Sequence, residues 1–118
     1  MESLNIDNLE IKVKKENSHI SISWMGKSDN RNPSASLIPY FNGMIDEIKG
    51  NSLRIDFTKL EYMNSSSVIP IIQFIKQLEG AAIPTEVVYD GSSSWQKKSF
   101  EALEKICNNL KNVNVKGI

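Results

Sequence analysis

LRIDFTKLEYMNSSSVIPIIQFIKQL, the stretch Leu53–Leu78, decides the fold because its hydrophobic period changes half-way along. Leu53, Ile55 and Phe57 alternate with polar residues, which predicts a strand with one apolar face. This strand is predicted to end near Lys59. Beyond the serines, apolar residues recur at three- and four-residue spacing, which is typical of a helix packed on a sheet. The stretch therefore predicts a strand that leads into a helix.

The polar run Asn64-Ser65-Ser66-Ser67 stands where the period changes. Asn and Ser are good N-cap residues, because a short side-chain oxygen can accept a hydrogen bond from an unpaired first-turn amide. Pro70 has no amide hydrogen and is tolerated only in or near the first turn of a helix. The helix is therefore predicted to begin within the serine cluster, with Ser65, Ser66 or both at the positive end of its dipole.

The runs Ile55-Asp56-Phe57, Leu60-Glu61-Tyr62-Met63 and Asn64-Ser65-Ser66-Ser67, followed by an apolar helix, resemble the signature of STAS domains. STAS domains are the fold of bacterial anti-sigma factor antagonists. Their signature is an apolar strand with an Asp, an aromatic and apolar pair, then Asp-Ser-Ser or Asp-Ser-Thr followed by Gly. The resemblance places Ser65 on the family's phosphorylatable serine, with Ser66 as the next candidate. Asn64 stands where the family usually has Asp, and Ser67 where it usually has Gly.

The remaining periodic segments predict an α/β fold, and the length suits a single STAS-like domain over residues 1–118. Strands are predicted around 9–13, 20–24, 83–89 and 113–115, and helices from about Ser36 to Lys49 and from about Trp95 to Asn109. Because Pro39 belongs in a first turn, the earlier helix is predicted to start at Ser36. We expect a mixed sheet of four to five strands with the three helices packed largely on one face, because the central strand alternates.

Two aromatic residues and the lone cysteine are assigned from the same periods. Trp24 continues an apolar strand face and is expected to be mostly buried, whereas Trp95 opens the last helix off its apolar stripe. That stripe is predicted to consist of Phe100, Leu103, Ile106, Cys107 and Leu110. Cys107 is therefore expected in the core.

Composition excludes several functional classes. Basic and acidic residues balance at 14 each without a long cationic cluster, which disfavours binding to nucleic acid. A single cysteine allows no internal disulfide and no multi-cysteine metal site. The sequence has no long apolar run, and its polar N-terminus lacks the layout of a signal peptide. We expect a cytoplasmic protein without membrane insertion, metal or cofactor.

Catalytic machinery is equally hard to find in the sequence. The phosphate-binding, dinucleotide-binding, zinc-protease and serine-hydrolase motifs are absent. His19 is the only histidine, and it stands at the start of an early predicted strand with no evident approach to Ser65. The chain is therefore predicted not to be an enzyme.

The run GKSDNRN, residues Gly26–Asn32, is polar and is predicted to be a loop. It resembles the segment that follows the second strand of STAS domains, close to the phosphorylation site. The resemblance implies that Asp29 and Lys27 line a partner-binding surface together with residues 64–67. The alternative is that the run is only a solvated connection.

The resemblance implies a non-enzymatic regulator of the anti-sigma factor antagonist type, which switches partners under control of phosphorylation at Ser65. Its implied partners are a serine kinase that also acts as an anti-sigma factor, and a phosphatase. A second hypothesis is an accessory subunit that binds a transport ATPase or a scaffold, with the serines serving only as caps; Ser92-Ser93-Ser94 shows that serine runs also occur elsewhere. A third is a small-ligand domain with its site near Asp29.

Overall fold

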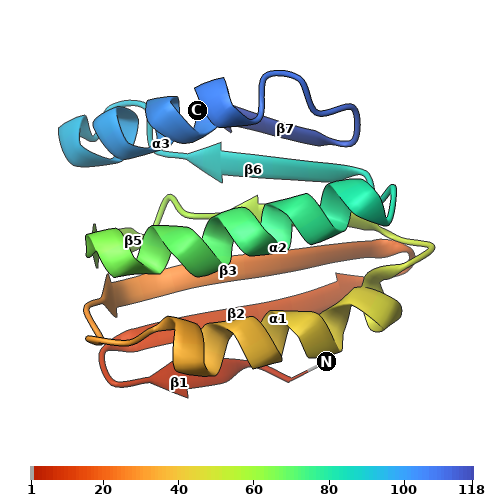
Figure 1. Ribbon diagram of the computed structural model, residues 1–118, viewed down its shortest axis with the longest axis horizontal. Helices are drawn as coiled ribbons and strands as arrows, with labels where there is room; N and C mark the ends of the chain where they lie inside the picture. The colour runs from red at the N-terminus through yellow and green to blue at the C-terminus, as the bar shows by residue number, and fades with distance from the viewer. Residues whose placement is uncertain (1) are drawn as a thin grey trace.

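The computed structural model describes residues 2–118 and shows one mixed sheet with three helices on one of its faces (Figure 1). The strands are β1 (Leu4–Ile6), β2 (Leu9–Glu16), β3 (His19–Ser28), β4 (Ser52–Asp56), β5 (Leu60–Met63), β6 (Thr85–Tyr89) and β7 (Val113–Gly117). The helices are α1 (Ser34–Ile48), α2 (Val68–Gly80) and α3 (Ser94–Ile106), and a 3-10 turn, Ser65–Ser67, precedes α2. The predicted α/β fold with its helices on one face is confirmed.

The strand order is β1-β2-β3-β4-β6-β7, with β5 paired to the end of β3. The pairs β1-β2 and β2-β3 are antiparallel, whereas β3-β4, β3-β5, β4-β6 and β6-β7 are parallel. The sheet has seven strands, more than the predicted four or five. The two unexpected strands are β1 and β5, which have three and four residues and are too short to display an alternating period.

Several predicted boundaries were wrong. β4 ends at Asp56 instead of near Lys59, and α3 ends at Ile106 instead of about Asn109. β3 continues to Ser28, so Gly26 and Lys27 belong to a strand rather than to a loop, because pairing with β5 extends the ladder. α1 starts at Ser34 instead of Ser36 and carries Pro39 inside the helix. The proline removes only one donor, the one that would bond to the carbonyl of exposed Ala35, where water can take its place.

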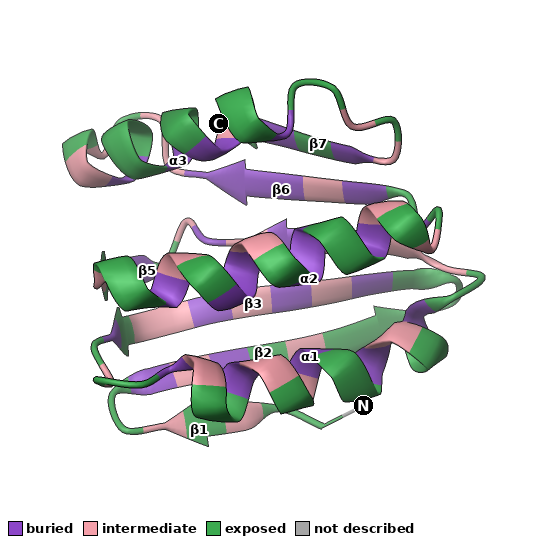
Figure 2. Cartoon of the chain, viewed as in Figure 1, coloured by how far each residue is buried: buried purple, intermediate pink, exposed green. Residues whose placement is uncertain are grey.

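The core lies between the helices and the covered face of the sheet. Leu53, Ile55 and Phe57 are buried there, as predicted, and Trp24 is 1% exposed. The Trp24 ring centroid lies 5.1 Å from that of Phe57, whose ring is 4.7 Å from that of Phe100 on α3. Figure 2 shows the buried stripes of the helices facing the strands. No helix within residues 2–118 is long and apolar enough to span a membrane.

The apolar stripe of α3 differs from the prediction at one position. Phe100, Leu103 and Cys107 are buried, but Ile106 is 55% exposed. Residues on one face of a helix recur at i, i+3, i+4 and i+7, and Cys107 takes that place after Phe100 and Leu103. Ile106 therefore falls beside the buried stripe instead of on it. The fourth buried residue is Gln96, a polar side chain that the period alone does not assign to the core.

Candidate functional site

The serine turn, defined here as Asn64–Ser67, joins β5 to α2 at the edge of the sheet where β3 and β5 end. These strands pair in parallel with Ser28 opposite Met63, and the Asn64 amide donates to the Ser28 carbonyl over 3.0 Å. The loop 29–33 leaves β3 at the same edge. The structure thus places the serine turn beside the segment that carries Asp29.

Asn64 caps the turn and also ties it to the neighbouring loop. Its Oδ1 accepts hydrogen bonds from the Ser67 amide at 3.0 Å and from the Ser67 hydroxyl at 2.6 Å. Its Nδ2 donates to the carbonyl oxygen of Asn30 at 2.8 Å. The predicted N-cap within this run is therefore the asparagine, and both ends of its side-chain amide are used.

Ser67 faces inward. Its side chain is fully buried, and its hydroxyl lies 2.6 Å from the Ser28 hydroxyl. A hydroxyl in this position cannot contact another molecule, which corrects the prediction that Ser67 belongs to the partner-binding residues. Its role is to fill a polar niche between β3 and the turn, where all its hydrogen-bonding capacity is used inside the protein.

Ser65 and Ser66 face outward. Both are exposed, and neither hydroxyl hydrogen-bonds to any other residue in the range 2–118. They belong to the 3-10 turn that leads into α2, at the positive end of the helix dipole, and the Val68 amide that follows donates to the Ser65 carbonyl. The serine run therefore divides into one structural serine and two that are accessible for modification.

The turn between β1 and β2 also reaches this edge. The Asn8 Nδ2 donates to the Asp29 carboxylate at 3.1 Å, and the Asn30 Nδ2 donates to the Asp7 carboxylate at 2.6 Å. Gly26 allows this approach, because a Cβ at its φ of 86° would lie 2.2 Å from the Asn8 carbonyl oxygen. Asp29 is thus exposed but already bonded. Sequence reasoning missed Asp7 and Asn8, although two polar residues between Ile6 and Leu9 are a recognisable turn signal.

Lys27 lies apart from Asp29 because it belongs to the last residues of β3. It is exposed and sits opposite Tyr62 of β5 in the parallel ladder. Tyr62 is 48% exposed, and Ile69, in the first turn of α2, is 57% exposed. Two large apolar side chains therefore flank the serine turn in the chain, and Lys27 stands next to the first of them.

Buried Gln96 holds the segment that leads into the serine turn. Its Nε2 donates to the carbonyl oxygens of Phe57 and Leu60, each at 2.8 Å, and its Oε1 accepts from the Asp90 amide at 2.8 Å. All three partners are main-chain groups: Phe57 and Asp90 follow the ends of β4 and β6, and Leu60 is the first residue of β5. Gln96 thus fixes the position of β5, and with it the serine turn, relative to α3.

Comparison with known proteins identifies the architecture. No family model matches the sequence, and no curated protein matches it. A chain in the complex of the diguanylate cyclase SiaD with its activator SiaC, from Pseudomonas aeruginosa, matches with a TM-score of 0.68 and 15% identity over 98% of each chain. An anti-sigma factor antagonist from Mycobacterium paratuberculosis gives 0.64 and 15%, over 94% of this chain and 90% of that one. The anti-sigma factor antagonist SpoIIAA, in its unphosphorylated form, gives a TM-score of 0.55 and 16% identity over 81% of this chain and 96% of that one. The chain has the STAS fold.

The two departures from the STAS signature are explained by one set of contacts. The Asn64 side-chain amide donates to the Asn30 carbonyl oxygen, whereas an Asp at position 64 would place a carboxylate oxygen, which is also an acceptor, against that carbonyl. A Gly at position 67 would leave the Ser28 hydroxyl without its present partner. Asn64 therefore suits its contact with Asn30, and Ser67 suits its contact with Ser28. We call these four hydrogen-bonded residues, which support the two outward serines, the frame.

A STAS domain with a catalytic serine would need a base near it, and His19 does not meet this requirement. His19 starts β3, whereas Ser65 follows the strand that pairs with the end of β3. Nine residues of strand at 3.3 Å each separate the two ends of β3 by about 30 Å. The His19 Nδ1 lies 2.8 Å from the Ser52 hydroxyl instead.

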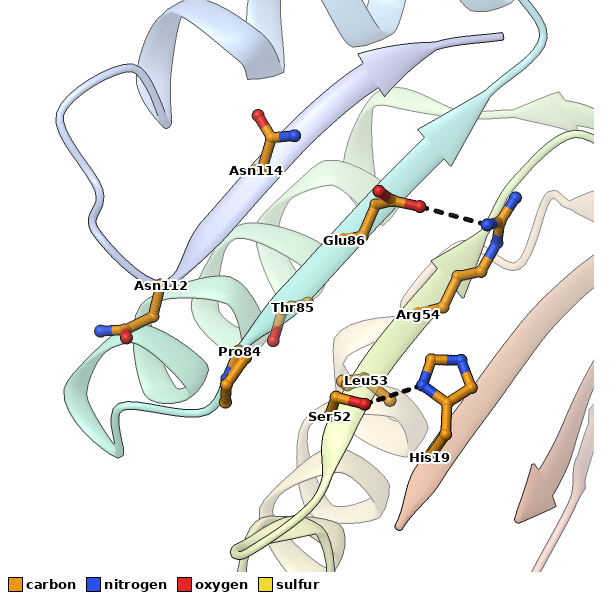
Figure 3. A pocket seen from close by; sticks show the side chains of 9 residues that line it. All are labelled: His19, Ser52, Leu53, Arg54, Pro84, Thr85, Glu86, Asn112 and Asn114. Carbon is orange, nitrogen blue, oxygen red and sulfur yellow. Dashed lines mark hydrogen bonds and ion pairs between the residues drawn. The ribbon is translucent and has the colours of Figure 1, made fainter. Parts of the chain in front are cut away.

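A polar pocket of about 390 Å³ surrounds His19 on the sheet face that carries no helices (Figure 3). Arg54 from β4 lies 3.1 Å from the Glu86 carboxylate on β6, and the Lys116 ammonium lies 3.0 Å from the same group. The charged groups of this pocket thus pair across neighbouring strands. The pocket lies at the end of the sheet opposite to the serine turn, and its paired charges support a structural role better than the recognition of a ligand.

Proposed function

We propose that this chain is a non-enzymatic, cytoplasmic STAS-type regulatory protein whose association with a protein partner is controlled by phosphorylation of Ser65. Ser66 is the second acceptor to consider. The observation that carries the proposal is the division of the serine run: Ser67 is buried in the frame, whereas Ser65 and Ser66 are exposed with unbonded hydroxyls. The partner-binding residues proposed are Asn64, Ser65, Ser66, Asp29 and Lys27.

A phosphate at this position would weaken binding of the partner more than it would destabilise the fold of the domain. The first-turn amides of a helix and the positive end of its dipole favour an anion, so the domain remains folded. A phosphoserine brings about −1.5 to −2 charges into the middle of the contact surface. Desolvating those charges and bringing them near a partner's carboxylates opposes association. Phosphorylation is therefore expected to switch binding off.

The classes of partner follow from the structural relatives as a proposal. SpoIIAA and the mycobacterial protein are anti-sigma factor antagonists, and SiaC is the activator of a diguanylate cyclase in a complex with it. These names support a protein partner. For this chain we propose a serine kinase that acts as an anti-sigma factor, together with a phosphatase that resets the switch, and no role for nucleic acid.

The alternative function is a constitutive adaptor for a transport ATPase or a signalling scaffold. One observation favours it: the Asn64 side chain is engaged with the Asn30 carbonyl and Ser67, so position 64 offers a kinase no free carboxylate. In an adaptor, Ser65 and Ser66 would be surface residues of a helix cap.

Partner binding by purified variants distinguishes the two functions. The wild type, Ser65→Ala and Ser65→Asp are compared against the partner obtained by affinity purification from native cells. We expect Ser65→Ala to bind like the wild type and Ser65→Asp to lose binding by roughly tenfold or more, which corresponds to about 1.4 kcal/mol. Asn114→Asp, at an exposed site on β7 at the end of the sheet opposite to the serine turn, controls for added charge alone. Equal binding by all variants would establish the adaptor and reject the switch.

A further inference from the structure

Arg31, in the loop 29–33 beside the serine turn, carries a guanidinium without a partner. Its side chain is exposed and forms no ion pair or hydrogen bond with another residue in the range 2–118. The two carboxylates of the same edge, Asp7 and Asp29, accept hydrogen bonds from asparagine side chains instead. Because a guanidinium is always charged and offers several donors, Arg31 is available to bind an anionic acceptor.

Hydrogen bonds fix the main chain of Arg31 relative to the serine turn. The peptide group that joins Asn30 to Arg31 supplies the carbonyl oxygen to which the Asn64 Nδ2 donates at 2.8 Å. The Asn32 amide donates to the Asn30 side chain, also at 2.8 Å, which closes a turn with Arg31 at its tip. The loop and the start of α2 lie at the same end of the sheet (Figure 1). Arg31 therefore projects from a turn that is anchored on the frame.

The guanidinium is within reach of a phosphate on Ser65. Covalent lengths on either side of the bond between Asn64 and the Asn30 carbonyl limit the separation of the Arg31 and Ser65 Cα atoms to about 13 Å. An extended arginine places its guanidinium about 7 Å from Cα, and a phosphoserine its outer oxygens about 5 Å, so a hydrogen bond of about 2.8 Å closes the gap. The Ser65 and Ser66 amides, which donate to no other residue in the described part of the chain, lie on the same turn.

Other cationic side chains near this edge are less well placed. Lys27 lies within β3, opposite Tyr62 in the ladder. Lys59 lines a pocket that β2 and β3 form on the sheet face without helices, whereas the serine turn leads into a helix on the other face. The peptide group of Arg31 is the one that contacts the Asn64 side chain. Arg31 is therefore the cation that the hydrogen bonds hold against the serine turn.

We propose that Arg31 is the intramolecular ligand of a phosphate on Ser65 and binds two of its oxygens through the guanidinium fork. The inference rests on the proposed function and adds to it the residue that recognises the phosphorylated state. A phosphoserine carries about −1.5 to −2 charges and three acceptor oxygens, and arginine matches such a group in a bidentate geometry. Phosphorylation then adds an anion to the partner-binding surface and also withdraws an unpaired cation from it. Both changes oppose a partner that offers carboxylates.

Phosphoserine encoded at position 65 during recombinant expression of the full chain tests this contact without a kinase. Phosphorus magnetic resonance over a pH titration gives the second pKa of the phosphate, which is about 6 for a phosphoserine without a partner. A bound guanidinium stabilises the dianion, so we expect this pKa to be lower by about 0.5 or more. Asp29, Glu61 and Lys27, the other charged groups on the segments around the turn, are unchanged in every variant. A difference between variants therefore isolates the guanidinium.

Arg31→Gln is expected to return the phosphate pKa toward its unpartnered value. Arg31→Lys keeps the charge but not the fork and is expected to lie between Arg31→Gln and the wild type. Lys111→Gln, which removes one positive charge at an exposed site before β7 and at the opposite end of the sheet, is the matched control and is expected to leave the pKa unchanged. Nitrogen-15 magnetic resonance supplies a second readout, because the Nε–H signal of Arg31 is expected to shift when phosphoserine is present. Equal pKa values in Arg31→Gln and the wild type, or an unshifted Arg31 signal, would overturn the proposal.

The result is separable from that of the phosphorylation switch. Encoded phosphoserine does not depend on whether native cells modify Ser65. A lowered pKa that requires Arg31, combined with equal partner binding by the Ser65 variants, would keep the contact and reject the switch. A working switch with the same phosphate pKa in Arg31→Gln and the wild type would reject the contact alone.

Discussion

Asn64 shows how a single side chain adapts this domain to its own loops. Its amide group joins the cap of the serine turn to the Asn30 carbonyl, so that an asparagine fits where a carboxylate would meet an acceptor. Asn64→Asp keeps the cap but loses the donor at 2.8 Å. We expect the free energy of unfolding to fall by about 1 kcal/mol, because the acceptor left unpaired is only partly buried.

Urea denaturation at neutral pH measures this loss. Asn64→Ala is the control, because it removes the cap as well as the donor and is expected to cost about 1 kcal/mol more. Equal stability of Asn64→Asp and the wild type would show that the bond to Asn30 contributes nothing, and the explanation offered for this departure from the STAS signature would be wrong.

Ala82 offers a second test at a single residue. It has a φ of 54°, a left-handed conformation that strains any side chain with a Cβ, at the end of α2 where glycine is the usual residue. Ala82→Gly is therefore expected to raise the free energy of unfolding by about 0.5–1 kcal/mol. Ala81→Gly is the matched control, because Ala81 has a φ of −90°. This control is expected to be destabilised, and a loss of stability in both variants would contradict the prediction.

Gln96 of α3 holds the segment that leads into the serine turn through hydrogen bonds to its main chain. Gln96→Leu would leave the Phe57 and Leu60 carbonyls and the Asp90 amide without their present partner. A loss of about 2–4 kcal/mol is expected in chemical denaturation, because these are buried main-chain groups. Lys97→Leu, at the next and exposed position, is expected to change stability by less than about 0.5 kcal/mol. Similar values for the two variants would show that Gln96 does not fix β5 to α3.

The contact between α3 and β6 predicts the behaviour at alkaline pH. The hydrogen bond to Glu104 and burial raise the pKa of Tyr89 from 10.0 to about 12. Since the folded protein holds this proton more tightly than the unfolded chain, the stability contributed is complete below pH 10 and is lost as the pH rises through about 12. Tyr89→Phe is expected to flatten the decline of unfolding free energy across that window. A decline of unchanged steepness in Tyr89→Phe would assign it to other groups.

Long elements with a clear period could be predicted from the sequence, and short ones could not. β4 and α2 follow directly from the alternation of Leu53, Ile55 and Phe57 and the helical stripe after the serines. β5 has four residues and exists because it pairs with β3, a contact that depends on tertiary structure. Pro39 predicts a helix start at Ser36, but α1 starts at Ser34 because a helix can lose one exposed hydrogen bond.

The candidate site was predictable in place but not in detail. The family resemblance directs attention to residues 64–67, and the change of period shows independently that they precede a helix. Ser67 faces inward because its hydroxyl bonds to Ser28 on a distant strand. The segment that leads into the turn is held by Gln96, which is 29 positions away from Ser67 in sequence. Such contacts have no local sequence period. They appear only when the strands are placed side by side.

Taken as a whole, the molecule separates its two faces. The face without helices carries the cross-strand ion pairs of Glu86, whereas the edge with the serine turn carries the unbonded hydroxyls of Ser65 and Ser66. This asymmetry explains why partner binding is assigned to the edge that contains Ser65. It also implies that charge substitutions on the open sheet face, such as Lys12→Glu, leave partner binding unchanged in the same affinity measurement.

Mapping of phosphate by tandem mass spectrometry, on the protein purified from its native cells with phosphatase inhibitors present, tests the switch most directly. The proposed function predicts phosphate on Ser65, with Ser66 the only other exposed serine in the turn and no phosphate on buried Ser67. Ser65→Ala expressed in the same cells should lose the modification. A fully unmodified Ser65 under conditions where partner binding changes would contradict the proposed switch.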